Sequence, residues 1–306
     1  MLVIGAGRAV VDPIGALLVA ALVVYEVGRR RLVAAGGDGR SAVVIEHQAW
    51  LFRLGVLVGA GVLFSPLRVI ASDQLFARAL IDVALAWVVA PLVVLGAPAN
   101  AFVAAIRPVR VLELQRYERL RAERSEWGGD VVPRWPIPGQ PVTGVAVLLL
   151  SVWLWHIPVI LDATVHDIGL QSLVFVSYLS GGVLWWMEMV GSHPYRPRLS
   201  HLARAVLVVA AFAGYWGLGA AMVYSQRSWY PAFLEGASAV LPGVMGQDYA
   251  GAFFWGLPSI PLGVASFWVF ARWLEGENAE EDRLARYLSR AGLSSPDGPA
   301  RNGPPS

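Results

Sequence analysis

The sequence predicts an all-α, polytopic membrane protein: a bundle of seven transmembrane helices with the N-terminus outside and the C-terminus in the cytoplasm. Three observations lead to this class. Apolar stretches of membrane-spanning length recur along the chain, arginines crowd into every second gap between them, and hydrophobic residues make up 56% of the 306 residues, with a mean hydropathy of +0.55. A helix needs about 20 apolar residues to cross a hydrocarbon core. The predicted spans are 13–33, 51–69, 75–97, 143–160, 169–190, 202–224 and 249–273.

The distribution of arginine predicts the orientation. Arginines fill the gaps after the first, third, fifth and seventh spans: Arg29, Arg30, Arg31, Arg40; Arg107, Arg110, Arg116, Arg119, Arg121, Arg124; Arg196, Arg198, Arg204; Arg272, Arg283, Arg286, Arg290. The other gaps hold only Arg68, Arg78 and Arg227. Cytoplasmic loops carry the excess of basic residues, so the arginine-rich gaps are expected to lie inside. An odd number of spans also places the two termini on opposite sides of the membrane, in agreement with this orientation.

The chain is expected to form one membrane domain, 1–275, followed by a cytoplasmic tail, 276–306. The first helix is expected to start at Pro13, with Asp12 as its N-cap. We do not expect it to be cleaved as a signal peptide, since the arginines follow the apolar stretch instead of preceding it. The domain includes a cytoplasmic amphipathic loop, 99–141, whose segment 107–126 fits either a helix on the inner leaflet or a solvated charged loop. The tail is predicted to be helical to about Arg290 and largely disordered beyond it.

Proline, glycine and tryptophan modify this simple bundle. Pro91 lies inside the third span, and Gly256, Pro258, Pro261 and Gly263 predict a kinked or interrupted seventh span. Small residues in the fifth and sixth spans permit close helix packing; they are Gly181, Gly182, Gly214, Gly217 and Gly219. The tryptophans near the span ends, among them Trp185 and Trp186, fit either an interfacial belt or packing inside the bundle.

The composition excludes several classes of function. The chain has no cysteine, so disulfides, thiolate metal sites and thiol catalysis are ruled out, and a metal site would need His, Met or carboxylate ligands. We find no nucleophile–base pair, phosphate loop or dinucleotide turn, and we therefore do not expect an enzyme. A nucleic-acid partner is not expected either, because the basic surface faces the anionic headgroups of membrane lipids.

Ionisable residues within a membrane are costly, which makes them candidates for function. In the assigned orientation these candidates gather near the outer side and could form an extracytoplasmic pocket. The buried polar pocket would contain Arg78, Asp82 and Asp248, and a metal site would draw on His156, Met222, Met245 and His166.

Each candidate also has a structural interpretation. Arg78 and Asp82 are four residues apart on one helix face, which suits a structural ion pair as well as a ligand site. His156 could bind a metal or simply hydrogen-bond to a neighbour. Met222 and Met245 could bind Cu(I) through their thioethers or serve as packing.

Five strings, in order between about residues 50 and 276, resemble one known family. They are SPL (65–67) followed by LF (75–76), APLVVLGAP (90–98), WLWHIP (153–158), GLGAAMVYSQRSWYP (217–231) and QDYAGAFFWGLP (247–258). Together they resemble the CtaG-type cytochrome c oxidase assembly factors. The resemblance implies a seven-span bacterial membrane protein that helps to assemble the copper-containing oxidase.

The chain departs from the histidine pattern of this family. An H-M-x-x-H step of the third span falls on Ala79, Leu80 and Val83, with Asp82 beside the second position. A second histidine pair, in the fifth span, falls on Leu170 and Val174. The family's Asp-Gln step falls on Gly246 and Gln247. His156 matches the family, and His166 is a shifted candidate. A copper site would therefore be degenerate, because one imidazole seldom holds copper tightly.

Our first hypothesis is a multi-pass accessory or assembly factor for cytochrome c oxidase in the bacterial plasma (inner) membrane. Its partners would be membrane lipids and terminal oxidase subunits or another membrane protein client, and a link to copper delivery on the extracytoplasmic side would be weakened. The alternative is a small-molecule or ion transporter, or a membrane binding protein, with an outer pocket around Asp82 and His156, because broken helices and buried carboxylates mark transport sites.

Overall fold

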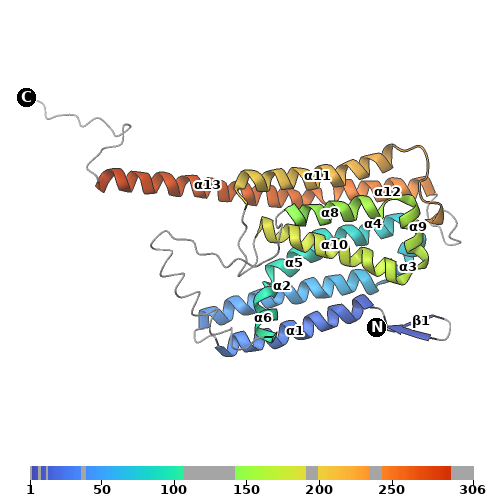
Figure 1. The fold of residues 1–306 in the computed structure, drawn as a ribbon, viewed down its shortest axis with the longest axis horizontal. Helices are drawn as coiled ribbons and strands as arrows, with labels where there is room; N and C mark the ends of the chain where they lie inside the picture. The colour runs from blue at the N-terminus through green and yellow to red at the C-terminus, as the bar shows by residue number, and fades with distance from the viewer. Residues whose placement is uncertain are drawn as a thin grey trace, which may run out of the picture.

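The computed structural model describes residues 2–5, 8–11, 13–35, 39–106, 142–190, 199–233 and 243–290. This part of the chain is helical apart from one short hairpin at its start (Figure 1). The elements are β1 Leu2–Gly5, β2 Arg8–Val11, α1 Pro13–Ala35, α2 Gly39–Phe64, α3 Pro66–Asp73, α4 Leu75–Ala84, η1 Leu85–Val89, α5 Ala90–Leu95, α6 Pro98–Ile106, α8 Val142–Trp155, α9 Pro158–His166, α10 Ile168–Met189, α11 His201–Tyr224, η2 Pro231–Phe233, α12 Gly243–Gly256 and α13 Ser259–Arg290.

The helices form a bundle whose spans run in nearly the same direction. In Figure 1, α1 and α2 lie on one side, α11 and α13 on the other, and α4, α5 and α10 between them. The predicted helical membrane class is confirmed. The antiparallel pairing of β1 and β2, with Leu2 opposite Val11, had no signal in the sequence analysis.

Five helical stretches are long and apolar enough to cross a membrane, and a sixth is obtained if α8 and α9 count as one bent span. The five are Val43–Phe64, Leu75–Leu95, Ile168–Met189, His201–Tyr224 and Met245–Leu274. They correspond to five of the predicted spans. The first predicted span, 13–33, is a continuous helix, α1, but Glu26 and three arginines interrupt its apolar character. The count of seven and the orientation therefore stay predictions.

The second span begins and ends earlier than predicted. The sequence analysis assigned 51–69, but α2 ends at Phe64 and the apolar window runs from Val43. Ser65 stops α2 and caps α3, because its hydroxyl oxygen accepts a hydrogen bond from the Leu67 backbone N–H at 3.2 Å, and Pro66 occupies the first turn of α3.

The third span is the centre of the bundle and changes helix type halfway along. In its most apolar stretch 61% of the residues are buried, compared with 28% to 44% in the other four candidate spans. Between α4 and α5 lies a π-helical turn, η1, which closes with a bond from the Ala90 N–H to the Leu85 carbonyl. Pro91 follows directly and has no N–H to donate, so a wider turn before it accommodates the missing bond.

Proline also breaks the fourth and seventh spans. The predicted span 143–160 is divided into α8 and α9, which meet at an angle of 80° just before Pro158. The predicted interruption of the seventh span is confirmed at Leu257 and Pro258, between α12 and α13, although both helices still belong to one candidate span. The predicted helix after Glu275 is also confirmed, since α13 continues to Arg290. Asp12, the loop 107–141 and the end of the tail lie outside the described residues.

Small residues allow the central helices to approach closely, as predicted. A methyl group added at Gly182 of α10 would lie 2.8 Å from the Ala86 carbonyl oxygen in the π-helical turn, and one at Gly219 of α11 would lie 2.5 Å from the Gly251 carbonyl oxygen of α12. Both contacts are to backbone, which cannot move aside as a side chain can.

Trp185 and Trp186 are core residues. Their exposed fractions are 1% and 4%, and both rings pack edge-on against Trp87. The Trp186 indole N–H donates to the Ala86 carbonyl at 3.2 Å. The interpretation as an interfacial belt is wrong for this pair, and the packing interpretation is confirmed.

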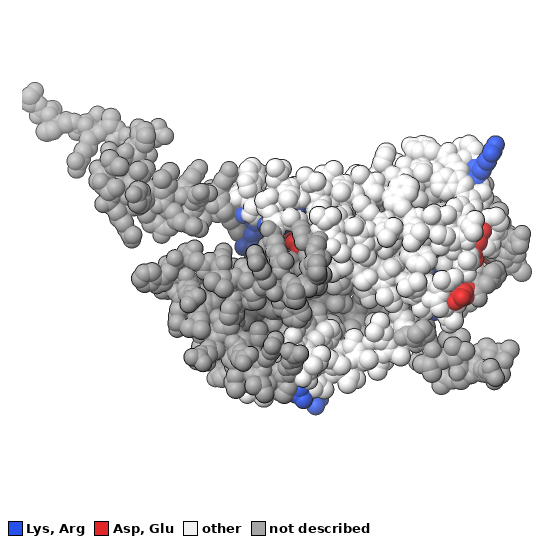
Figure 2. All heavy atoms as spheres, viewed as in Figure 1, with Lys and Arg blue, Asp and Glu red and all other residues white. Residues whose placement is uncertain are grey.

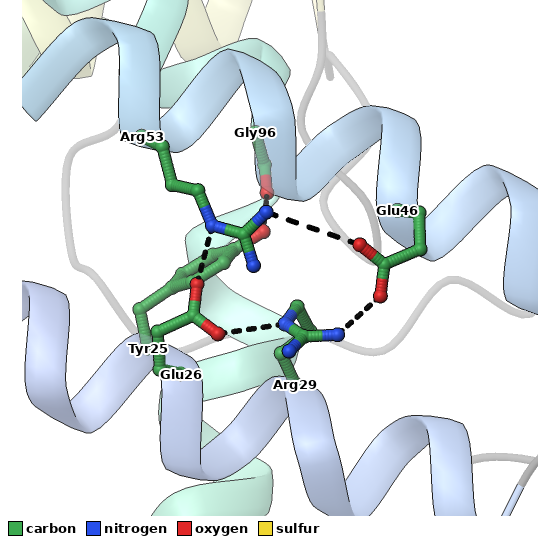
Figure 3. Close-up of polar contacts among 6 residues, drawn as sticks. All are labelled: Tyr25, Glu26, Arg29, Glu46, Arg53 and Gly96. Atoms are coloured by element: carbon green, nitrogen blue, oxygen red, sulfur yellow. Dashed lines mark hydrogen bonds and ion pairs between the residues drawn. The ribbon is translucent and has the colours of Figure 1, made fainter.

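The charges of α1 pair with those of α2. Figure 3 shows the two helices joined by two arginines and two glutamates. Glu26 of α1 forms ion pairs with Arg53 of α2 at 2.6 Å and with Arg29 of its own helix at 2.8 Å. Arg29 also forms an ion pair with Glu46 of α2. The formal charges of these two glutamates and two arginines sum to zero. Inserting the paired helices into a membrane should therefore cost less free energy than inserting α1 alone. The Tyr25 hydroxyl donates to the Gly96 carbonyl at 2.8 Å and ties α1 to the end of the third span.

Candidate functional site

The predicted site residues Arg78 and Asp82 lie on α4 and form a buried ion pair. The Arg78 Nε and Asp82 Oδ2 atoms are 3.5 Å apart, and the two side chains are 1% and 0% exposed. At this separation the contact is ionic rather than a well-formed hydrogen bond. The predicted structural ion pair is therefore present.

The ion pair has few other polar contacts. Neither carboxylate oxygen of Asp82 accepts a hydrogen bond from a residue in the described ranges, and the same holds for Nε and Nη2 of Arg78 as donors. The Arg78 guanidinium stacks over the Phe175 ring of α10, with its central carbon 4.7 Å from the ring centroid. At this buried position each charge therefore depends mainly on the other, since Coulomb interactions strengthen as the dielectric constant falls.

His156 sits at the break between α8 and α9 and is 4% exposed. Its Nδ1 atom lies 2.8 Å from the Val152 carbonyl oxygen, so Nδ1 carries the proton and donates it. The other nitrogen, Nε2, then has a lone pair, and no described residue donates to it. The ring packs edge-on against Phe254 of α12, 4.6 Å between centroids. The hydrogen-bonding interpretation of His156 holds for Nδ1, and Nε2 keeps the capacity to bind a cation or a donor.

Tyr178 of α10 connects His156 with the ion pair. Its hydroxyl is 3.4 Å from His156 Nδ1, and it interacts electrostatically with both Asp82 and Arg78. Arg78, Asp82, His156 and Tyr178 are here called the buried polar cluster. The cluster joins three spans and is closed, because all four side chains are buried.

Two residues that the sequence analysis did not select support the cluster. The Tyr230 hydroxyl donates to the His156 carbonyl at 3.0 Å, which satisfies a backbone group freed by the helix break. Burial raises the pKa of Tyr230, and nearby Asp162 raises it further, so this hydroxyl stays protonated as a donor.

Gln247 of α12 fixes the loop that carries Tyr230. Its side chain is fully buried; Oε1 accepts from the Trp229 N–H at 2.9 Å, and Nε2 donates to the Met222 and Arg227 carbonyls at 3.1 and 3.2 Å. Gln247 begins the string QDYAGAFFWGLP of the family resemblance, but its backbone partners lie 18 to 25 residues away and leave no local signal of this role.

The remaining predicted site residues differ in how deeply their side chains are buried. Met222 is fully buried on α11, whereas Met245 on α12 is 45% exposed. Asp248 is half-buried, and the His166 side chain lies outside the described residues. No group of three or more His, Asp or Glu side chains in the described ranges is placed to hold a metal ion. Such a group, within the described ranges, includes neither the thioethers of Met222 and Met245 nor the His166 side chain, so the proposed copper ligands stay a prediction.

Comparison with known proteins decides the family. The sequence model of the cytochrome c oxidase caa3 assembly factor family matches residues 23–276, which is most of the chain and runs from the middle of α1 into α13. The chain belongs to this family. No curated protein and no solved structure shows significant similarity to it.

Membership confirms the resemblance seen in the five sequence strings. It associates the chain with the assembly of cytochrome c oxidase and implies an accessory rather than a catalytic role. The matched region contains the whole buried polar cluster, together with Tyr230 and Gln247.

Proposed function

We propose that this protein is a seven-span accessory factor of a bacterial plasma membrane that assists the assembly of cytochrome c oxidase through lateral contacts between helices. Family membership is the observation that carries the proposal. The closed bundle supports it over the transport alternative, because Asp82 is 0% exposed and its charge is taken up by Arg78. Loss of the protein is therefore expected to lower the amount of assembled oxidase in the membrane.

We include α1 as the seventh span. The neutral network of Glu26, Arg29, Glu46 and Arg53 supports this, since paired charges cross a membrane at much lower cost than single ones (Figure 3). Figure 2 shows acidic and basic residues at both ends of the bundle, so the proposed orientation rests on the arginine-rich gaps of the sequence. The arginine-rich end would face the cytoplasm.

Cysteines introduced one at a time can test this orientation, because the wild-type chain contains no cysteine. An impermeant maleimide is expected to label Ala9→Cys and Gln226→Cys in intact cells, and Ser289→Cys only after the membrane is permeabilised. If α1 does not cross the membrane, Ala9→Cys will instead behave like Ser289→Cys while Gln226→Cys remains labelled. That result would reduce the bundle to six spans.

We further propose that the oxidase role does not depend on tight copper binding by this chain. Within the buried polar cluster, one imidazole nitrogen, His156 Nε2, has no hydrogen-bond partner among the described residues, and the carboxylate in the same cluster is neutralised by Arg78. The Arg78 guanidinium interacts electrostatically with His156 and would repel an added cation. A single imidazole beside a fixed positive charge is a poor site for Cu(I).

Copper content provides the test. The purified protein, incubated with Cu(I) and then desalted, is expected to retain well below one copper per chain, and His156→Ala is expected to retain the same amount. Near-stoichiometric copper in the wild type that disappears in His156→Ala would contradict this, and it would establish a rebuilt site around His156. Loss in Met222→Leu as well would then identify the thioether ligand.

A further inference from the structure

A groove on the membrane-facing surface lies between α11 and α13. It has a volume of about 570 Å³ and is lined by apolar side chains, including Ala205, Val208 and Val209 of α11 and Val269, Phe270 and Trp273 of α13. This volume is in the range of small-molecule binding sites. The two helices lie side by side in Figure 1. Both present large exposed apolar residues, such as Val209 and Phe270, which are 65% and 50% exposed.

The position of the groove between two candidate membrane spans restricts which molecules can fill it. Both helices belong to candidate membrane spans. In a membrane, the surface between them would face hydrocarbon and not water. An apolar hollow in that position must be filled by a lipid chain or by another helix, because empty space forfeits the dispersion contacts of its lining.

Polar groups at one end of the groove favour a lipid. His201, the first residue of α11, lines this end, and its Nδ1 accepts a hydrogen bond from Arg204 Nη2 at 3.2 Å. The proton of His201 is therefore on Nε2, which can donate to an anion. The Arg204 Nε atom is buried and has no hydrogen-bond partner in the described part of the chain. Trp273 lines the groove as well, and tryptophan favours the level of the lipid headgroups.

Basic side chains of both helices meet at this end. Arg204 interacts electrostatically with Arg272 of α13, a like charge, and with Glu188 of α10, an opposite one. Arg204 and Arg272 each stand next to a residue that lines the groove, Ala205 and Trp273. Basic pockets between transmembrane helices recognise anionic lipid headgroups in this way.

We propose that the groove between α11 and α13 is a binding site for one phospholipid with an anionic headgroup. Its acyl chain packs between Val209 and Phe270, and its phosphate accepts hydrogen bonds from His201 and Arg204. The lipid would stabilise the packing of α13 on α11. This site is separate from the buried polar cluster and does not depend on the oxidase role.

Native mass spectrometry of the delipidated, full-length protein tests the headgroup contact. With phosphatidylglycerol and phosphatidylcholine of identical chains, the wild type is expected to bind one phosphatidylglycerol about tenfold more tightly, because both lipids offer a phosphate but the choline ammonium places a further positive charge beside Arg204. Arg204→Gln is expected to abolish this preference. Arg30→Gln, a matched change of an exposed arginine elsewhere on α1, is expected to keep it. Equal binding of both lipids by the wild type, or an unchanged preference in Arg204→Gln, would overturn the proposal.

A second pair of variants tests the groove itself. Ala205→Trp fills it and is expected to lose both lipids, whereas Val206→Trp, at the next residue and outside the lining, is expected to retain them. A photoreactive benzoylphenylalanine at Val209 then reports the occupant in living cells. A phospholipid adduct supports the proposal, and an adduct to another protein would overturn it by assigning the groove to a partner helix.

Discussion

Asp82→Leu is expected to lower the free energy of unfolding by about 3–5 kcal/mol, the largest effect of any single substitution considered. The substitution leaves the Arg78 guanidinium, 1% exposed, without the carboxylate that balances its charge. No described residue accepts a hydrogen bond from Arg78 Nε or Nη2. The change is measured as the midpoint and free energy of unfolding in a fixed detergent, by the fluorescence of the 13 tryptophans.

Two further variants separate the lost pairing from a general loss of packing. The double substitution Arg78→Leu with Asp82→Leu removes both charges, so its stability is expected to return to within about 1 kcal/mol of the wild type. Asp167→Leu removes an exposed carboxylate that caps α10 through the Gly169 and Leu170 N–H groups, and is expected to cost only about 1 kcal/mol. A double variant as unstable as Asp82→Leu would contradict the assignment of Arg78 and Asp82 as mutual counterions.

Gln247→Leu is expected to cost about 2–4 kcal/mol, although leucine has nearly the same size. It leaves the Trp229 N–H and the Met222 carbonyl without the side-chain partner that binds them. The Arg227 carbonyl keeps a second donor, the Ser225 hydroxyl, at 2.8 Å. The loop of Tyr230 should loosen as a result, and the hydrogen bond that Tyr230 donates to His156 should weaken with it.

The matched control for this prediction is Gln226→Leu. Gln226 lies in the same loop but is exposed, so the same chemical change is expected to alter stability by less than about 0.5 kcal/mol. Hydrogen exchange of the Trp229 amide gives a local readout, and it should accelerate in Gln247→Leu only. Equal stability of the two variants would show that the Gln247 hydrogen bonds contribute little.

Features set by short-range rules could be predicted from the sequence. Hydropathy located most of the spans, because their apolar length is a local property. Pro258 marked the interruption of the seventh span, since a proline cannot donate a backbone hydrogen bond, whereas the break before Pro158, inside the predicted span 143–160, was not predicted. The Arg78–Asp82 pair followed from a spacing of four residues on one helix face.

Features that depend on distant partners could not be predicted. The angle of 80° between α8 and α9 and the burial of Trp185 are set by neighbouring helices. The role of Gln247 rests on backbone groups of another helix and a loop. The span Val43–Phe64 was predicted to begin at residue 51, too far along the chain, because Glu46 and Arg53 reduce the hydropathy of this stretch. Their charged partners on α1 can be identified only from the three-dimensional structure.

The amount of assembled cytochrome c oxidase in membranes lacking this protein tests the proposed role most directly. The account predicts that deletion lowers oxidase activity and assembled enzyme several-fold, while the transcripts of the oxidase subunits stay constant. A plasmid carrying the wild-type gene or the Gln226→Leu variant should restore both, and a tagged copy should copurify with oxidase subunits. Normal oxidase content and activity in the deletion strain would contradict an assembly role for this chain.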